Sequence, residues 1–231
     1  MTKPTPDRIA FETSPFRHAE FMIGATEVSQ LHAPAGIEIA FAGRSNAGKS
    51  SALNAIAGRG RLAFVSKTPG RTQQINVFRI GECDRFLVDL PGYGYAKVAK
   101  TQRKHWDRVL SSYLQDRPTL AGLVLIMDAR HPLTELDWQM LQWFAPTGRP
   151  VHVLLTKSDK LSRSERNKVL EQVNREMSGA PIVISVQLFS SLDGTGVAEA
   201  QKLISLWLGH SETAGEPARA QFRNSRPPAS E

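Results

Sequence analysis

The chain has 231 residues, of which 41% are hydrophobic, so its length and composition fit one large domain with a substantial core. The longest run without Asp, Glu, Lys or Arg is residues 177–192, and Gly, Pro, Ser and Gln interrupt it, which argues against a membrane-spanning helix. A single cysteine, Cys83, excludes an internal disulfide framework and suits a reducing cytoplasm, while the net charge of +7 favours a polyanionic partner, nucleic acid first.

Strands and helices are predicted to alternate between an N-terminal extension and a polar tail. We interpret residues 1–36 as an extension docked on the domain, 37–208 as the domain, and 209–231 as a disordered tail. The predicted strands are 37–42, 74–80, 85–89, 122–127, 151–155 and 182–186. The predicted helices are 49–57, 101–115, 134–144, 164–177 and 197–208.

This order predicts an α/β fold with helices on both faces of a mostly parallel sheet. The strands are nearly continuous apolar runs, which is typical of strands covered on both faces. The turn "GECD" joins 74–80 to 85–89 as a hairpin, so one of the six predicted strands is antiparallel. In helix 101–115, five apolar residues share one face, and Arg103, Lys104 and Arg108 lie mostly off it. These five residues are Trp106, Val109, Leu110, Tyr113 and Leu114.

The first motif, "GRSNAGKS", follows a predicted strand and opens a predicted helix, which is the context of a phosphate-binding P-loop. Glycines let the backbone approach closely, and the helix N-terminus favours an anion. Lys49 would bridge the β- and γ-phosphates, and the hydroxyl of Ser50 would bind Mg²⁺. The predicted phosphate-binding residues are Gly43, Arg44, Ser45, Asn46, Ala47, Gly48, Lys49, Ser50 and Ser51. Together with the predicted order of strands and helices, this motif indicates an α/β fold of the three-layer P-loop NTPase class.

The second motif, "DLPG", ends the strand predicted to lie beside the P-loop strand. Asp89 at the strand end would reach Mg²⁺ through water, and the amide of Gly92 would meet the γ-phosphate. We include Leu90 and Pro91 in the predicted site. Because D-x-x-G is common by chance, its position after a P-loop carries the prediction.

The third motif, "TKSD", contains Thr156, Lys157, Ser158 and Asp159 and follows the strand "VHVLL". The Asp159 carboxylate would accept hydrogen bonds from N1–H and the 2-amino group of guanine, a donor pair that adenine lacks. Lys157 would lie along the base and support the P-loop. After the next strand, a backbone amide within Phe189, Ser190 and Ser191 would meet the guanine carbonyl.

Together, "GRSNAGKS", "KTPGRTQ", "DLPGYGYA", "DARHP", "TKSDKL" and "FSSL" resemble the EngB (YihA/YsxC) family of bacterial GTPases over residues 15–208. The resemblance implies that Thr72 completes the Mg²⁺ shell, with Thr68 as the alternative, so that Lys49, Thr72 and Gly92 are the catalytic residues. It adds Gly70, Arg71, Gln73 and Gln74 to the nucleotide site. It also implies a Ras-like G domain. The protein would be cytoplasmic, bind GTP and GDP, act on the large ribosomal subunit or its precursor, and be needed for cell division and septation. We expect a monomer with no membrane partner.

Two residues bear on the expected hydrolysis rate. Ras-like GTPases place a water-orienting Gln directly after the D-x-x-G glycine, whereas this chain has Tyr93, so we expect slow intrinsic hydrolysis. Asn46 resembles the P-loop asparagine that binds K⁺ in potassium-activated relatives. The alternative is a loop residue that tolerates an unusual turn.

Basic residues flank the phosphate site on both sides. From Gly43 to Arg79 there are basic side chains and no acid, and a second cluster surrounds Lys104. The leading hypothesis is a switch whose loops 66–76 and 89–100 are ordered by Mg²⁺-GTP and dock on ribosomal RNA. The alternatives are a division protein that works without the ribosome, a GTPase component of an RNA-modification system, and a P-loop kinase. No lid-like arginine insertion supports the kinase.

Overall fold

The computed structural model describes residues 14–31, 33–60, 62–63, 74–94 and 100–209, apart from the side chains of 100–103. Its strands are β1 (Ala19–Ala25), β2 (Ile37–Gly43), β3 (Ile75–Ile80), β4 (Arg85–Asp89), β5 (Leu120–Asp128), β6 (Val151–Thr156) and β7 (Ile184–Leu188). The α-helices are α2 (Lys49–Ala57), α3 (Lys100–Asp116), α4 (Glu135–Phe144), α5 (Arg163–Met177) and α6 (Val197–Trp207). Short 3₁₀ helices are η1 (Pro15–His18), η2 (Val28–Gln30), η3 (Ala145–Thr147) and η4 (Ser158–Lys160).

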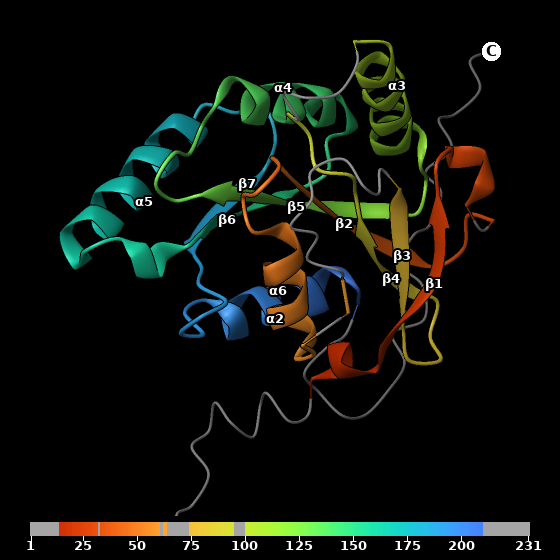
Figure 1. The fold of residues 1–231 in the computed structure, drawn as a ribbon, viewed down its shortest axis with the longest axis horizontal. Coiled ribbons are helices and arrows are strands. Elements are labelled where there is room, and N and C mark those ends of the chain that lie inside the picture. Colours follow the sequence, from red (N-terminus) through yellow and green to blue (C-terminus); the bar gives the residue numbers. More distant parts are fainter. Residues whose placement is uncertain (1–13, 32, 61, 64–73, 95–99, 210–231) are drawn as a thin grey trace, which may run out of the picture.

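The strands form one sheet in the order β1-β3-β4-β2-β5-β6-β7 (Figure 1). β3 runs antiparallel to both of its neighbours, and the other neighbouring pairs are parallel. Helices α3, α4 and α5 cover one face, and α2 and α6 cover the other (Figure 1). The predicted fold class is confirmed. Among the described strands, β3 is the antiparallel one, and an apolar layer covers each face of the sheet.

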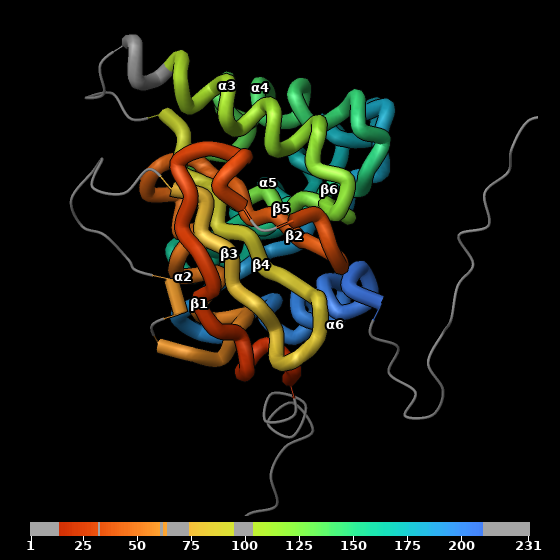
Figure 2. Tube along the Cα trace, turned by 90° about the vertical axis from the view of Figure 1, so that its right-hand side faces the viewer, coloured from red at the N-terminus to blue at the C-terminus, as the bar shows by residue number. Residues whose placement is uncertain are grey.

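Within the part of the chain that the structure describes, the sheet has seven strands, so the predicted number of six was wrong. The additional strand, β1, lies within residues 1–36. It forms the edge of the sheet and pairs with β3, which separates it from β4 (Figure 2). Phe21 and Met22 on β1 are 60% and 46% exposed, so no alternation of buried and exposed side chains marks this strand. Phe16, in η1, is fully buried against the α2 side of the sheet.

The largest boundary error concerns β7. We predicted a strand at 182–186, but β7 begins at Ile184, which pairs with Val151 of β6. Val183 is 73% exposed and precedes the strand. The apolar run that begins at Ile182 therefore starts before the strand does, and composition alone does not locate the register of a parallel pair.

The predicted helix features agree with the structure. On α3, the five apolar residues of the predicted face are all buried, whereas Lys104 and Arg108 are exposed. Thr134 directly precedes α4 and forms a capping box with Asp137, whose Oδ2 accepts from the Thr134 amide (3.0 Å) and hydroxyl (2.8 Å). Cys83 is exposed in the turn between β3 and β4.

A buried ionic cluster lies near the amino end of the central strand. Glu38 on β2 is fully buried, and its Oε1 accepts from the Arg117 guanidinium (Nη2, 2.7 Å) and the Thr119 hydroxyl (2.7 Å). The Tyr113 hydroxyl donates to Glu38 Oε2 at 2.7 Å, and burial, together with the charge of Glu38, raises the pKa of Tyr113 well above its ordinary value. The cluster connects β2 to the end of α3. Within the described ranges, no helix is long and apolar enough to cross a membrane.

Candidate functional site

Four sequence motifs lie at the carboxyl ends of parallel strands, at one edge of the sheet. β2 ends at Gly43, β4 at Asp89, β6 at Thr156 and β7 at Leu188. These strands run in the same direction, and ligands of open α/β sheets bind at this edge. The fold therefore brings 43–51, 89–92, 156–159 and 189–191 to one side of the molecule.

The loop from β2 to α2 requires glycine at two positions. A Cβ added to Gly43 would lie 2.9 Å from the Cβ of Ile126 on β5, so a side chain there would push the strands apart. Gly48 has φ +101° and precedes Lys49, the first residue of α2. Since Gly48 has no side chain to cap the helix, the first amides of α2 can bind an anion. Ser50 and Ser51 lie half-buried in this first turn.

Side chains from the end of β6 hold two carbonyl groups of this loop. The Thr156 hydroxyl donates to the carbonyl oxygen of Ala47, and the Lys157 Nζ donates to that of Asn46 at 2.7 Å. Asn46 is exposed and has φ +63°, and Lys157 has φ +58°, both uncommon for residues with a side chain. The "TKSD" and "GRSNAGKS" motifs therefore form one connected unit.

Lys49 and Asp89 are in direct contact. The ammonium group of Lys49 forms an ion pair with Asp89 Oδ1, and the two side chains are only 11% and 9% exposed. Opposite charges this close and this well shielded from water attract strongly. Lys49, predicted to bind phosphate, and Asp89, predicted to reach Mg²⁺ through water, therefore lie together at the first turn of α2.

The backbone of Tyr93 pairs with the loop after β2. The Ser45 amide donates to the Tyr93 carbonyl oxygen at 2.9 Å, and the Tyr93 amide donates to the Gly43 carbonyl oxygen at 3.3 Å. Leu90 and Pro91 are buried, and Gly92 is half-buried. Gly92 is thereby held next to the loop that begins at Gly43.

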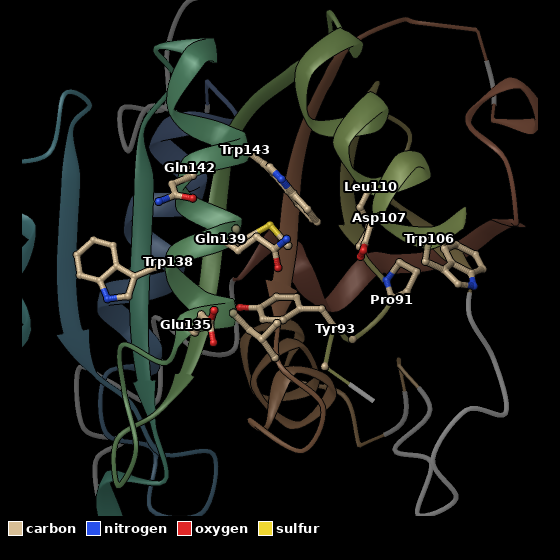
Figure 3. A pocket seen from close by; sticks show the side chains of 14 residues that line it. Pro91, Tyr93, Trp106, Asp107, Leu110, Glu135, Trp138, Gln139, Gln142 and Trp143 are labelled. Carbon is tan, nitrogen blue, oxygen red and sulfur yellow. The ribbon is translucent and has the colours of Figure 1, made fainter. Parts of the chain in front are cut away.

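The side chain of Tyr93 points away from that loop, toward α4. Its hydroxyl donates to Asp137 Oδ1 at 2.9 Å, and burial, followed by the charge of Asp137, raises the pKa of Tyr93 well above its ordinary value. The phenol is therefore a permanent donor at neutral pH. Its ring lines a cavity of about 710 Å³ between α3 and α4, toward which Trp143, Gln139 and Asp107 also point (Figure 3).

Asp159 lies beside the loop after β7. The Ser190 hydroxyl donates to Asp159 Oδ1 at 2.8 Å, and Lys160 Nζ is 3.2 Å from Oδ2. These contacts, the Ser190 hydrogen bond first, lower the pKa of Asp159 below its ordinary value, so the carboxylate is ionised at neutral pH. A hydrogen-bond acceptor of fixed charge suits a ligand with two adjacent donors.

Two of the three amides in "FSS" already have partners. The Phe189 amide donates to the Leu155 carbonyl oxygen and the Ser190 amide to that of Thr195, each at 2.9 Å. Ser191 is exposed and is the remaining candidate for an amide that meets a ligand. Ser158 is fully buried, and among the described residues its hydroxyl has no hydrogen-bond partner.

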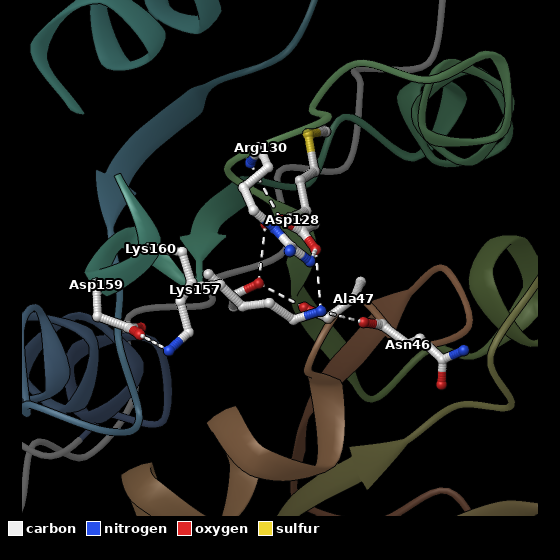
Figure 4. A network of polar contacts seen from close by, with 9 residues as sticks. Asn46, Ala47, Asp128, Arg130, Lys157, Asp159 and Lys160 are labelled. Atoms are coloured by element: carbon white, nitrogen blue, oxygen red, sulfur yellow. Dashed lines mark hydrogen bonds and ion pairs between the residues drawn. The ribbon is translucent and has the colours of Figure 1, made fainter. Parts of the chain in front are cut away.

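Asp128 and Arg130 of the "DARHP" pattern join the same network, although sequence reasoning assigned them no role (Figure 4). Asp128 ends β5, next to Thr156, and its Oδ2 lies 2.9 Å from Lys157 Nζ. The Arg130 guanidinium donates to both carboxylate oxygens of Asp128, from Nε to Oδ1 at 2.9 Å and from Nη2 to Oδ2 at 2.7 Å. An acid at a strand end beside the P-loop strand was the available signal in the sequence.

Several predicted residues cannot be placed. Gly70, Arg71, Thr72, Gln73 and the alternative Thr68 lie outside the described residues, as do 95–99 and 210–231. Gln74 directly precedes β3 and is half-buried. The Mg²⁺ ligand attributed to Thr72 therefore stays a prediction.

Known proteins resemble this chain over most of its length. The family model described as "50S ribosome-binding GTPase" matches residues 38–157. "Probable GTP-binding protein EngB" of Methylobacillus flagellatus is 62% identical over 193 residues, which cover 84% of this chain and 93% of the relative. The protein of the same name from Nitrosomonas eutropha is 58% identical over 83% of this chain and 86% of the relative.

A solved structure agrees at the level of the fold. The crystal structure of a probable GTP-binding protein engB matches with a TM-score of 0.60 and 19% identity, covering 75% of this chain and all of that one. At this identity the match supports the arrangement of the sheet and helices, while the curated relatives support the family.

The Tyr93–Asp137 hydrogen bond yields a stability prediction. Tyr93→Phe removes a buried donor to a carboxylate and keeps the ring, so we expect a loss of about 1.5–3 kcal/mol in the free energy of unfolding. Thr134→Ser keeps the other hydroxyl donor to Asp137 and should stay within about 0.5 kcal/mol of the natural protein. Urea unfolding measures both variants, and equal stability of Tyr93→Phe and the natural protein would contradict the role assigned to this bond.

Proposed function

Because the chain belongs to the EngB family of GTP-binding proteins, we propose that it is a Mg²⁺-dependent GTPase with slow intrinsic hydrolysis that acts as a switch in assembly of the large ribosomal subunit. Normal cell division and septation would depend on it. The observation that carries the GTP-binding part of the proposal is the direct connection of the "TKSD" motif to the P-loop through Lys157 and Thr156.

The proposed nucleotide lies along the carboxyl edge of the sheet. Its phosphates bind the amides of 43–51 and Lys49, and its base lies against Lys157 with Asp159 at the N1–H and 2-amino groups. Guanine fits because Asp159 offers acceptors only, and adenine would present its N1 lone pair to the same anion.

The metal proposal rests on the oxygen atoms near Lys49. Mg²⁺ prefers oxygen ligands, and the Ser50 hydroxyl and the Asp89 carboxylate both lie beside the first turn of α2. Ser50 would bind the ion directly and Asp89 through water, with Thr72 as the further protein ligand. The ion would neutralise phosphate charge, while Lys49 and the amide of Gly92 bind the terminal phosphate.

The position of the Tyr93 side chain supports the proposed slow hydrolysis. A residue that orients the attacking water must point toward the terminal phosphate, and the Tyr93 hydroxyl is bound to Asp137 on α4. We propose that acceleration comes from the ribosomal particle, from K⁺ bound at Asn46, or from both.

The base specificity is tested by replacing Asp159. The natural protein should bind GDP and GTP far more tightly than ATP. Asp159→Asn replaces one acceptor by a donor, so we expect GDP affinity to fall by on the order of 100-fold or more. The affinity for xanthosine diphosphate, whose base has an oxygen in place of the 2-amino group, should rise. Asp84→Asn removes a surface carboxylate in the β3–β4 turn and is the matched control. Titration with fluorescent nucleotides measures these affinities, and tight ATP binding by the natural protein would overturn the guanine assignment.

The potassium proposal concerns the loop around Asn46. If Asn46 helps to bind K⁺, GTP turnover should be several-fold faster in KCl than in NaCl at equal ionic strength, and Asn46→Ala should remove the difference. Phosphate release under both salts measures this effect. Equal rates for the natural protein in the two salts would leave Asn46 as a loop residue that tolerates a positive φ.

The ribosomal proposal is supported by the description of the matching family model, by the net charge of +7 and by the exposed Lys104 and Arg108 on α3. We expect co-sedimentation with large ribosomal subunits in the presence of a non-hydrolysable GTP analogue, and weaker binding with GDP. Binding should fall as salt rises. Failure to bind in either state would favour a division protein that works independently of the ribosome.

A further inference from the structure

The Asp128 carboxylate carries four short polar contacts, which is more than a simple surface ion pair. Arg130 donates to Oδ1 from its backbone amide (3.0 Å) and from Nε (2.9 Å), and to Oδ2 from Nη2 (2.7 Å). Lys157 Nζ reaches the same Oδ2 at 2.9 Å. The Asp128 side chain is 7% exposed, so water competes little for these contacts.

The charge state of this group is fixed. Partial burial alone would favour the neutral acid, but the hydrogen bonds from Arg130 and then Lys157 hold the pKa of Asp128 well below its ordinary value. The carboxylate is therefore an anion across the physiological pH range. An anion placed here attracts the Lys157 ammonium group and orients it.

The direction of the Lys157 side chain depends on this anion. Lys157 directly precedes η4 in a left-handed backbone conformation, and its ammonium group extends between two acceptors, the Asp128 carboxylate and the Asn46 carbonyl. Among the described residues, Asn46 O and the Asp128 carboxylate are the acceptors in contact with Lys157 Nζ, so without Asp128 the carbonyl alone would hold the ammonium group. A lysine on a four-carbon stem has many rotamers, so the loss of one acceptor would let it leave the loop.

We propose that Asp128 is a positioning residue for the guanine nucleotide. Arg130 holds the Asp128 carboxylate by two hydrogen bonds, and the carboxylate orients Lys157 along the base position. Through Lys157, it also fixes the Asn46 carbonyl of the P-loop. This inference rests on the proposed function, because it assigns Asp128 and Arg130 to the support of that same site. Asp128 touches no nucleotide itself. Its effect on nucleotide binding passes through Lys157.

The experiment measures dissociation of fluorescent GDP from the full chain. Asp128→Asn keeps the size of the side chain and removes its charge, and we expect dissociation to become about tenfold faster, equivalent to about 1.4 kcal/mol. Arg130→Gln leaves the Asp128–Lys157 pair and should accelerate dissociation about two- to threefold. Asp84→Asn, which removes an exposed carboxylate at the opposite end of β4 from Asp89, should have no effect.

A double-mutant cycle separates positioning from general stability. Because Asp128 acts through Lys157, adding Asp128→Asn to Lys157→Ala should change GDP dissociation less than twofold. A full tenfold effect in that background, or unchanged dissociation in Asp128→Asn with the natural Lys157, would overturn the inference. If Asp128→Asn does not fold, the Arg130→Gln and Lys157→Ala pair gives the same cycle.

The two proposals fail in different ways. If the natural protein does not bind GDP, the proposed function fails and the variants have nothing to report. If the natural protein binds GDP and the cycle shows no coupling between Asp128 and Lys157, the guanine site stands and Asp128 is a structural acid at the end of β5.

Discussion

The site depends on how the backbone carbonyls of the loop after β2 are satisfied. A loop that turns its amides toward an anion turns carbonyl groups outward, and a carbonyl that is buried, like that of Ala47, is costly to leave without a donor. Here the Thr156 hydroxyl bonds the Ala47 carbonyl and the Lys157 ammonium group bonds the Asn46 carbonyl. The segment proposed to read the base therefore also holds the shape of the segment proposed to bind the phosphates. A change at either segment should be felt at the other.

A second set of contacts connects the same loop to α4, in the layer of helices that also contains α3 and α5. Tyr93 pairs through its backbone with Gly43 and Ser45, and through its hydroxyl with Asp137, which also caps α4. The residue that replaces the Gln of Ras-like GTPases is thus part of the packing between the sheet and α4. This explains in physical terms why a tyrosine fits the position directly after Gly92, and it is the basis of the proposed slow hydrolysis.

Local patterns predicted those parts of the protein that local chemistry decides. The parallel strands are buried on both faces and read as apolar runs, and the glycines at 43 and 48 meet steric demands that other residues cannot. Edge strand β1 was not predicted because Phe21 and Met22 are exposed. The range predicted for β7 lay two residues too early because the register of this strand depends on β6. Both errors concern pairing between distant segments, which periodicity does not encode.

The sequence by itself determined the fold class, the order of the motifs and the residue types that suit a guanine nucleotide, because each depends on short-range geometry or on the functional groups of a few side chains. Only the tertiary structure decided the partners of those groups. It brought Lys49 to Asp89, Tyr93 to Asp137, and Asp128 to Lys157. These pairs are 40, 44 and 29 positions apart in the chain, and their contacts arise because parallel strands end at one edge of the sheet.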